Sequence, residues 1–474
     1  MPTIGSLMRG PIPRYLVQHV ERVESYMREW MLDNFLLVTG QRAVSDRAIH
    51  ERYRDLNDGR LLREAIEHRH HAYARALANP YFAASLVDAG DRLRAARRDL
   101  TTTLGGETVR IPQLIERWVS ASGHDRDELA HAALMLLERR SAAERDWVEA
   151  HATAVRALGF DRHTDLLRAT HDDVDPWLRH AQRWLDETRD PFLESWRKWR
   201  RRDGIEGSPF NPNLGRPPTA PEAARDLVTA VRDSVAAWGF GEVAARIPID
   251  VEQRPGKSAL SMCGRIAPPN DVRVTTIASD QLVAYAVLLH EFGHALHFAF
   301  GADRPFDLFG DYQGITEAFG MTFQWAATQR EWFSTFAGVA LEEESVDRLR
   351  FLMELLRRMD AIHVLYEFAV HSGDVEPATE FVRLYARELD VQITPHLAYW
   401  RMQLFLEHRP FYPMYLHQAN SMRGALWDEL VERGGAQWFL NDRSRSHLVA
   451  RFRLTCEVDL PEWMNILGVA ISRA

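Results

Sequence analysis

Apolar residues recur at intervals of three and four through most of this 474-residue chain. Residues 16–35 are an example, because their apolar side chains fall on one face of a helix. The alternation of apolar and polar residues that marks a strand is scarce. Its best instance is the β-branched run at residues 272–277, which follows a Pro-Pro-Asn turn signal. The pattern therefore predicts an almost entirely α-helical protein.

A run rich in glycine and proline interrupts the helical pattern between residues 204 and 221. Such residues break helices and favour turns and loops. We therefore expect an N-terminal helical half at residues 1–205, a connection at residues 206–221 and a C-terminal helical half at residues 222–474.

Composition and charge narrow the class of protein. Hydrophobic residues make up 46% of the chain and charged residues 26%, as in soluble globular proteins. A net charge of −9 gives no basic surface for a nucleic acid, so we expect no such partner. Two cysteines are too few for a disulfide framework and the first residues lack a secretory signal, so we expect a cytoplasmic protein. The most apolar segment, residues 282–300, carries three histidines and a glutamate, so we expect no membrane span.

The segment from His290 to His294 carries the chemistry, and it reads His-Glu-Phe-Gly-His. This is the H-E-x-x-H pattern, in which the two histidines lie on the same side of a helix and can reach one metal ion. Glu291 then lies beside the same turn without being a ligand. A carboxylate at that place can act as a general base.

Two alternatives compete with a catalytic metal site at this motif: a chance match between buried histidines that only form hydrogen bonds, and a structural zinc site. The second is disfavoured because structural sites close with four protein ligands and usually include cysteine, whereas a catalytic zinc needs three ligands and one open position. Glu317, which is 23 residues after His294, is the first candidate for the third ligand. That separation suits a helix, a loop and the start of a second helix. Asp311 is second, and Asp303 and Asp307 lie in the same loop-like stretch, where carboxylates are normally solvated.

Residues 290–297 resemble the active-site helix of the thimet oligopeptidase and oligopeptidase F family. Residues 316–320 resemble the helix with the third ligand in that family and in angiotensin-converting enzyme. Both are gluzincins, zinc peptidases whose third ligand is a glutamate. Residues 258–273 resemble the hairpin before the zinc helix, and the close match covers about residues 255–330.

The resemblance implies a mostly α-helical, elongated gluzincin peptidase fold. A small β-hairpin or sheet should precede the zinc helix, and a deep central channel should admit short peptides. It also implies that the strand at residues 272–277 holds the substrate backbone by strand addition.

Members of this family place tyrosines opposite the zinc, where a phenol donates to the oxyanion. The comparable stretch here is residues 411–418, in which Tyr415 is the first candidate and Tyr412 and His417 follow. The glycine- and tyrosine-rich run that is usual in thimet oligopeptidase is missing, and core packing is the alternative role for both tyrosines. His297, one turn beyond the motif, is expected to pack near the metal site rather than to be a fourth ligand.

The leading hypothesis is a zinc-dependent metallopeptidase, with the C-terminal half as its catalytic half. One Zn²⁺ would be held by His290, His294 and Glu317, and Glu291 would take the proton of the attacking water. A second hypothesis keeps the metal but makes the protein a non-proteolytic hydrolase or biosynthetic enzyme for a small amide-like metabolite. A third, an inactive peptide-binding scaffold, is disfavoured because all three ligands and the base are present. Manganese or cobalt would suit the same ligands, and the oligomeric state stays open.

Overall fold

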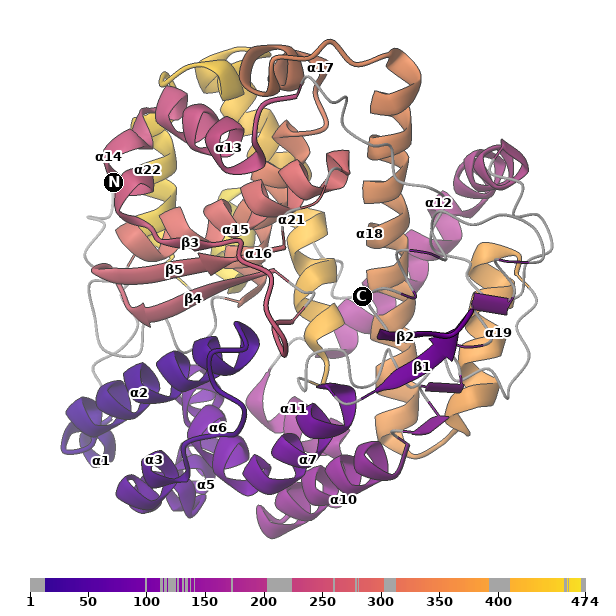
Figure 1. Cartoon of the computed structure of the whole chain (residues 1–474). Helices are drawn as coiled ribbons and strands as arrows, with labels where there is room; N and C mark the ends of the chain where they lie inside the picture. The colour runs from indigo at the N-terminus through magenta and orange to yellow at the C-terminus, as the bar shows by residue number, and fades with distance from the viewer. Residues whose placement is uncertain are drawn as a thin grey trace. The chain divides into compact units, whose positions relative to one another are not determined.

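The computed structural model confirms the predicted fold class, since helices dominate and the strands form two small sheets (Figure 1). It describes residues 13–98, 100–110, 141–171, 174–202, 224–258, 261–277, 279, 281–301, 313–391, 410–455, 458 and 460–469, with single positions between 114 and 139.

The chain forms two compact units, and each is assembled from separate stretches of the sequence. The first unit comprises Met1–Tyr81, Pro218–Met353 and Tyr415–Ile471, and the second comprises Phe82–Pro217, Glu354–Met414 and Ser472–Ala474. The chain passes between the units inside α6 (His71–Ser85), α18 (Glu343–Ser372) and α21 (Tyr412–Gly434), and also at Pro217–Pro218, within the expected connection. The two halves expected from the sequence stay a prediction. The expected connection at residues 206–221 lies outside the described residues.

The first unit contains the sheet of three strands and the motif residues. Its described elements are α1 (Arg14–Val17), α2 (Val20–Val38), α3 (Arg47–Arg52), α4 (Arg54–Asn57), α5 (Arg60–Glu67), most of α6 (His71–Ser85), α13 (Leu227–Val235), the π-helix Ala236–Phe240, α14 (Gly241–Arg246), β3 (Ile249–Asp250), β4 (Met262–Ala267), β5 (Asp271–Thr275), α15 (Leu282–Phe300), α16 (Gln313–Ala326), α17 (Arg330–Trp332), the π-helix Phe333–Ala337, the start of α18 (Glu343–Ser372), most of α21 (Tyr412–Gly434), the 3₁₀ helix Trp438–Leu440, α22 (Arg445–Leu454) and α23 (Leu460–Ile466).

The second unit is helical apart from one hairpin. Its described elements are α7 (Val87–Arg98), β1 (Thr101–Leu104), β2 (Glu107–Arg110), α10 (Ser141–Ala157), α11 (His163–Thr170), α12 (Val174–Arg202), most of α18, and α19 (Pro377–Leu389). The hairpin β1–β2 was not predicted. Its signals are a run of three threonines and a Gly-Gly turn in which Gly105 and Gly106 both have positive φ, as two-residue hairpin turns require.

The three-stranded sheet has the order β3-β5-β4, with β5 parallel to β3 and antiparallel to β4 (Figure 1). The predicted hairpin before α15 (Leu282–Phe300) is therefore present. β5, which contains most of the predicted strand, is the central strand, and β4 is an edge strand among the described residues. At Val274 and Thr275 β5 is paired on both sides, so its backbone is not free there for the substrate strand expected at residues 272–277.

Helices α2 and α15 cover opposite faces of β4. On one face, Phe35 of α2 lies against Gly264, where a Cβ atom would be 2.6 Å from the phenyl ring. Side chains alternate along a strand, so Cys263 and Arg265 project from the other face. Arg265 lies there 5.9 Å from the ring centre of Phe298 in α15. The strand is thereby held directly beside the helix that carries the motif.

Helix α15 is the one described helix that is long and apolar enough to cross a membrane by length and composition. Its apolar window is 78% buried inside the protein, as in a core helix. It ends at Gly301, which is its C-cap.

Candidate active site

Two glycines allow α15 and α16 to pack closely enough for their side chains to meet. A Cβ atom at Gly293 would lie 2.7 Å from Cα of Gly320, and a Cβ atom at Gly320 would lie 2.8 Å from Cε1 of His290. Contacts of that length are not possible for a real side chain. The close approach therefore depends on glycine at both positions.

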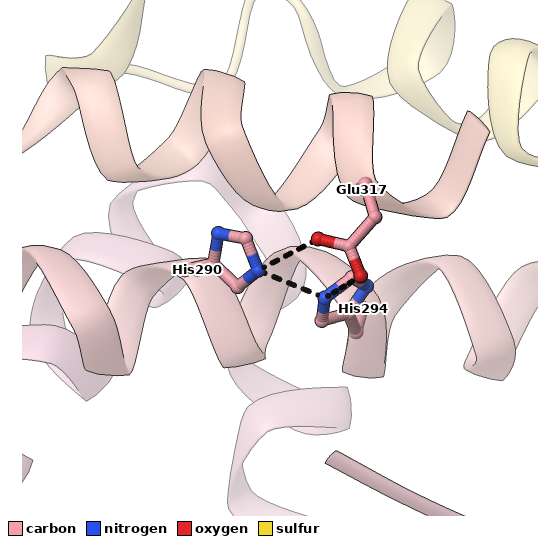
Figure 2. Close-up of side chains that lie close together, drawn as sticks. All are labelled: His290, His294 and Glu317. Atoms are coloured by element: carbon pink, nitrogen blue, oxygen red, sulfur yellow. Dashed lines mark hydrogen bonds and ion pairs between the residues drawn. The ribbon is translucent and has the colours of Figure 1, made fainter. Parts of the chain in front are cut away.

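This packing brings together His290, His294 and Glu317, whose side chains point into the space between the two helices (Figure 2). The Nε2 atoms of the histidines are 3.0 Å apart, and the Glu317 oxygens lie 3.2 Å from Nε2 of His290 and 3.6 Å from Nε2 of His294. Ligands at the corners of a tetrahedron around zinc, with bonds of about 2.1 Å, lie about 3.4 Å from one another. The three side chains therefore fit one metal ion. Among the described residues they form the one set of three His, Cys, Asp or Glu side chains that does.

Each histidine also makes a hydrogen bond at its other ring nitrogen. Nδ1 of His290 lies 3.1 Å from Oε1 of Gln324, and Nδ1 of His294 lies 2.9 Å from Oγ1 of Thr316. Hydrogen bonds at Nδ1 orient an imidazole and leave Nε2 for a metal. In both rings Nε2 is the atom that faces Glu317.

The two imidazoles differ in their electrostatic surroundings. Burial by itself lowers the pKa of His290, but the carboxylates of Glu317 and Glu291 outweigh it and raise that pKa to about 9. Burial lowers the pKa of His294 to about 4, and Arg265 contributes in the same direction. The negative charge of Glu317 therefore acts more strongly on His290 than on His294.

Glu291 is buried, with 7% of its surface exposed, and its charge acts on both His290 of α15 and Cys263 of β4. Burial raises the pKa of the Cys263 thiol, and the charge of Glu291 raises it further, which places this carboxylate near β4. Glu291 is not part of the convergent set of three. The structure thus keeps it beside the ligands but separate from them.

The residues expected opposite the metal lie in α21. Tyr412 and Tyr415 are half-buried, and His417 is 1% exposed. A Cβ atom at Gly314 would lie 2.7 Å from Oε1 of Gln418, which places this part of α21 against the first turn of α16. Tyr415 precedes Gln418 by three residues and so projects toward nearly the same side, whereas His417 lies about 100° away from it.

Several solved structures resemble the whole chain. The first is a protein assigned as oligoendopeptidase F, with 16% sequence identity and a TM-score of 0.67 over 99% of this chain and 91% of the other. A second oligoendopeptidase F, from Bacillus anthracis str. Ames, has 14% identity and a TM-score of 0.62 over 96% of this chain and 82% of the other. PZ peptidase A with an inhibitor has 12% identity and a TM-score of 0.66 over 99% of this chain and 96% of the other. The chain has the oligoendopeptidase F fold. No family model and no curated protein matches its sequence.

The oligoendopeptidase F fold thus carries here the three side chains predicted as metal ligands. The structure places His297 away from them, because its Nε2 lies 2.7 Å from Oγ1 of Thr455 and its ring packs against Phe319. The rival ligands Asp303, Asp307 and Asp311 lie outside the described residues.

Sequence reasoning missed Thr316, Gln324 and Arg265. A signal for Gln324 was present, because it follows Glu317 by seven residues, which is two helical turns on the same face. Thr316 is adjacent to Glu317, but nothing local shows that its hydroxyl meets His294. Arg265 lies near the site only because β4 packs on α15.

Proposed function

We propose that this protein is a zinc-dependent peptidase that hydrolyses short peptides. The observation that carries the proposal is the convergence of His290, His294 and Glu317, with Glu291 buried beside them. The fold supports it, because its structural neighbours are described as oligoendopeptidases and as a PZ peptidase.

The donor set favours a catalytic metal over a structural one. Two imidazole nitrogens and one carboxylate leave a position open for substrate or water, and no cysteine completes the set among the described residues. A divalent ion held there polarises a carbonyl group and lowers the pKa of water.

Glu291 is proposed as the general base and acid. Its carboxylate accepts a proton from the attacking water and later delivers that proton to the amine of the leaving peptide. Its burial supports this role, since a carboxylate shielded from bulk water holds and returns a proton at one place. His290, His294 and Glu317 would hold the ion that binds the reacting carbonyl and water beside this carboxylate.

Strand β4 is proposed to align the substrate. It is an edge strand, so an extended peptide can pair with its backbone. Cys263 and Arg265 project from β4 toward the metal-site helix. A peptide paired with this edge would therefore run past the catalytic groups.

Tyr415 is proposed as the donor to the oxyanion that forms when water attacks the carbonyl. Its half-buried position on the side of α21 that faces the start of α16 supports this role. Tyr412 and His417 are the next candidates.

Metal analysis of the purified protein, combined with a mixed peptide library read by mass spectrometry with and without a chelator, tests the proposal. We expect about one zinc per chain and peptide cleavage that the chelator abolishes. Bound metal without cleavage of any peptide would favour a small amide metabolite as the substrate. If the protein binds no metal and cleaves no peptide, the remaining hypothesis is the inactive peptide-binding scaffold.

A further inference from the structure

Gln324 has only one arrangement of its side-chain amide that satisfies both of its neighbours. Its Oε1 lies 3.1 Å from Nδ1 of His290, and its Nε2 lies 3.1 Å from Sδ of Met353. A thioether sulfur accepts hydrogen bonds and cannot donate one. The NH₂ group therefore faces Met353, and the carbonyl oxygen faces His290.

This orientation decides which nitrogen of His290 carries a proton. The amide oxygen of Gln324 only accepts, so Nδ1 of His290 must donate. Nε2 is then the nitrogen whose lone pair can be given to a metal, and it is the atom that lies 3.2 Å from Glu317. A flipped amide would set its oxygen against the sulfur and its NH₂ against a protonated Nδ1.

We propose that Gln324 and Met353 are positioning residues that hold His290 in its metal-binding tautomer, with the thioether fixing the amide. Met353 can do this because it is buried, with 7% of its surface exposed, in the part of α18 that belongs to the same unit as the site. The inference rests on the metal-binding part of the proposed function and not on peptide hydrolysis.

His294, the neighbouring proposed ligand, has a hydrogen-bond partner that does not fix its tautomer. The partner of His294 is the hydroxyl of Thr316, which can both donate and accept and so does not impose a tautomer. Both partners are uncharged. A carboxylate in place of the Gln324 amide would make His290 a stronger base and should bind the metal more tightly.

The test is the Zn²⁺ dissociation constant, measured by competition with a chromophoric chelator, together with the visible spectrum of the Co²⁺ form. We expect Gln324→Ala to weaken Zn²⁺ binding by about 10- to 100-fold. Gln324→Glu should bind at least as tightly as the wild type. Met353→Leu keeps the volume but removes the acceptor, and it should weaken binding by a smaller factor.

A double-mutant cycle and a matched control separate this role from general packing. If Met353 acts through the amide, Gln324→Ala combined with Met353→Leu should bind Zn²⁺ no more weakly than Gln324→Ala alone. Met359→Leu removes another buried methionine of α18, with 8% of its surface exposed, and should leave the affinity unchanged.

Two outcomes would overturn the inference. Wild-type Zn²⁺ affinity and Co²⁺ spectrum in folded Gln324→Ala and Met353→Leu would remove both residues from the positioning role, while the proposed metal site stood. Absence of Zn²⁺ binding by the wild type would overturn the proposed function as well.

Discussion

Glu291 can be separated from metal binding because its neighbours on α15 supply the ligands. Glu291→Gln keeps the size of the side chain but removes the basic oxygen that accepts the water's proton. We expect kcat to fall by about 10²-fold or more while zinc content stays at the wild-type level. Both quantities can be measured on one sample, by metal analysis and by peptide hydrolysis. Wild-type turnover with full zinc would contradict the base role, and loss of zinc would make Glu291 a ligand.

Tyr415→Phe removes one hydroxyl and leaves the ring in place. If this hydroxyl donates to the oxyanion, kcat should fall by about 10²-fold, since one such donor is typically worth that much. Zinc content and the unfolding midpoint should not change. Tyr412→Phe is measured alongside, because Tyr412 is another half-buried tyrosine of α21 and the next candidate for the donor. Unchanged kinetics in Tyr415→Phe would assign Tyr415 to packing and make Tyr412 and His417 the next residues to test.

At the scale of elements, the contact between α15 and α16 should be the most sensitive point of the site. Gly320→Ala places a methyl group where the His290 ring now lies, with an approach of 2.8 Å. The helices must separate or the ring must turn, so we expect Zn²⁺ affinity to fall by at least about tenfold and stability by about 1–3 kcal/mol. Chelator competition and denaturant unfolding measure the two effects.

Gly424→Ala is the control for that substitution. Gly424 lies in helix α21, and a Cβ atom there meets nothing within 4 Å. Alanine should therefore raise stability, by up to about 1 kcal/mol, because it favours the helix more than glycine does. Equal effects of the two substitutions on Zn²⁺ affinity would show that α15 and α16 do not need their close contact.

At the scale of the whole molecule, a cluster of three histidines should make the second unit sensitive to acid. The ring centres of His151 and His163 are 4.3 Å apart, and those of His163 and His371 are 5.3 Å apart. Phe82 stacks on His151, and Phe411 packs edge-on against His163. Burial lowers the pKa of His151 to about 3 and that of His371 to about 4, and burial with the neighbouring rings also lowers the pKa of His163.

The contribution of this cluster to the free energy of unfolding should be fully present above about pH 6.5, and it should be lost as the pH falls below that value. Below that pH the histidines bind protons in the unfolded chain but not in the folded one. Each histidine therefore lowers the free energy of unfolding by up to about 1.4 kcal/mol per pH unit. We expect His163→Phe, which cannot take up a proton, to lose less stability between pH 7 and pH 5 than the wild type. Denaturant unfolding at each pH checks this, with His68→Gln, an exposed histidine, as the control. An equal loss in all three proteins would contradict the cluster's role.

Local periodicity explains what could be predicted from the sequence. The apolar residues of α2 and α15 repeat at helical spacing, so the helical class followed from the chain alone. In the same way, the spacing of four residues from His290 to His294 sets both imidazoles on one side of α15, whatever packs against it. Glu317 could be ranked above its rivals because a second helix could begin at that distance along the chain.

Only the tertiary structure decided the features that depend on contacts between distant elements. Among the described residues, strand order made β4 an edge strand and β5 the central one, and pairing between strands is not encoded in the period of either one. The chain also passes between the two units inside α6, α18 and α21, where the sequence has no linker-like signal. Met353 reaches Gln324 only because the start of α18, which belongs to the first unit, lies against α16. A helical or strand period determines which face of an element a residue occupies. Long-range packing determines which residues that face contacts, and this packing gave His290 and His294 their hydrogen-bond partners.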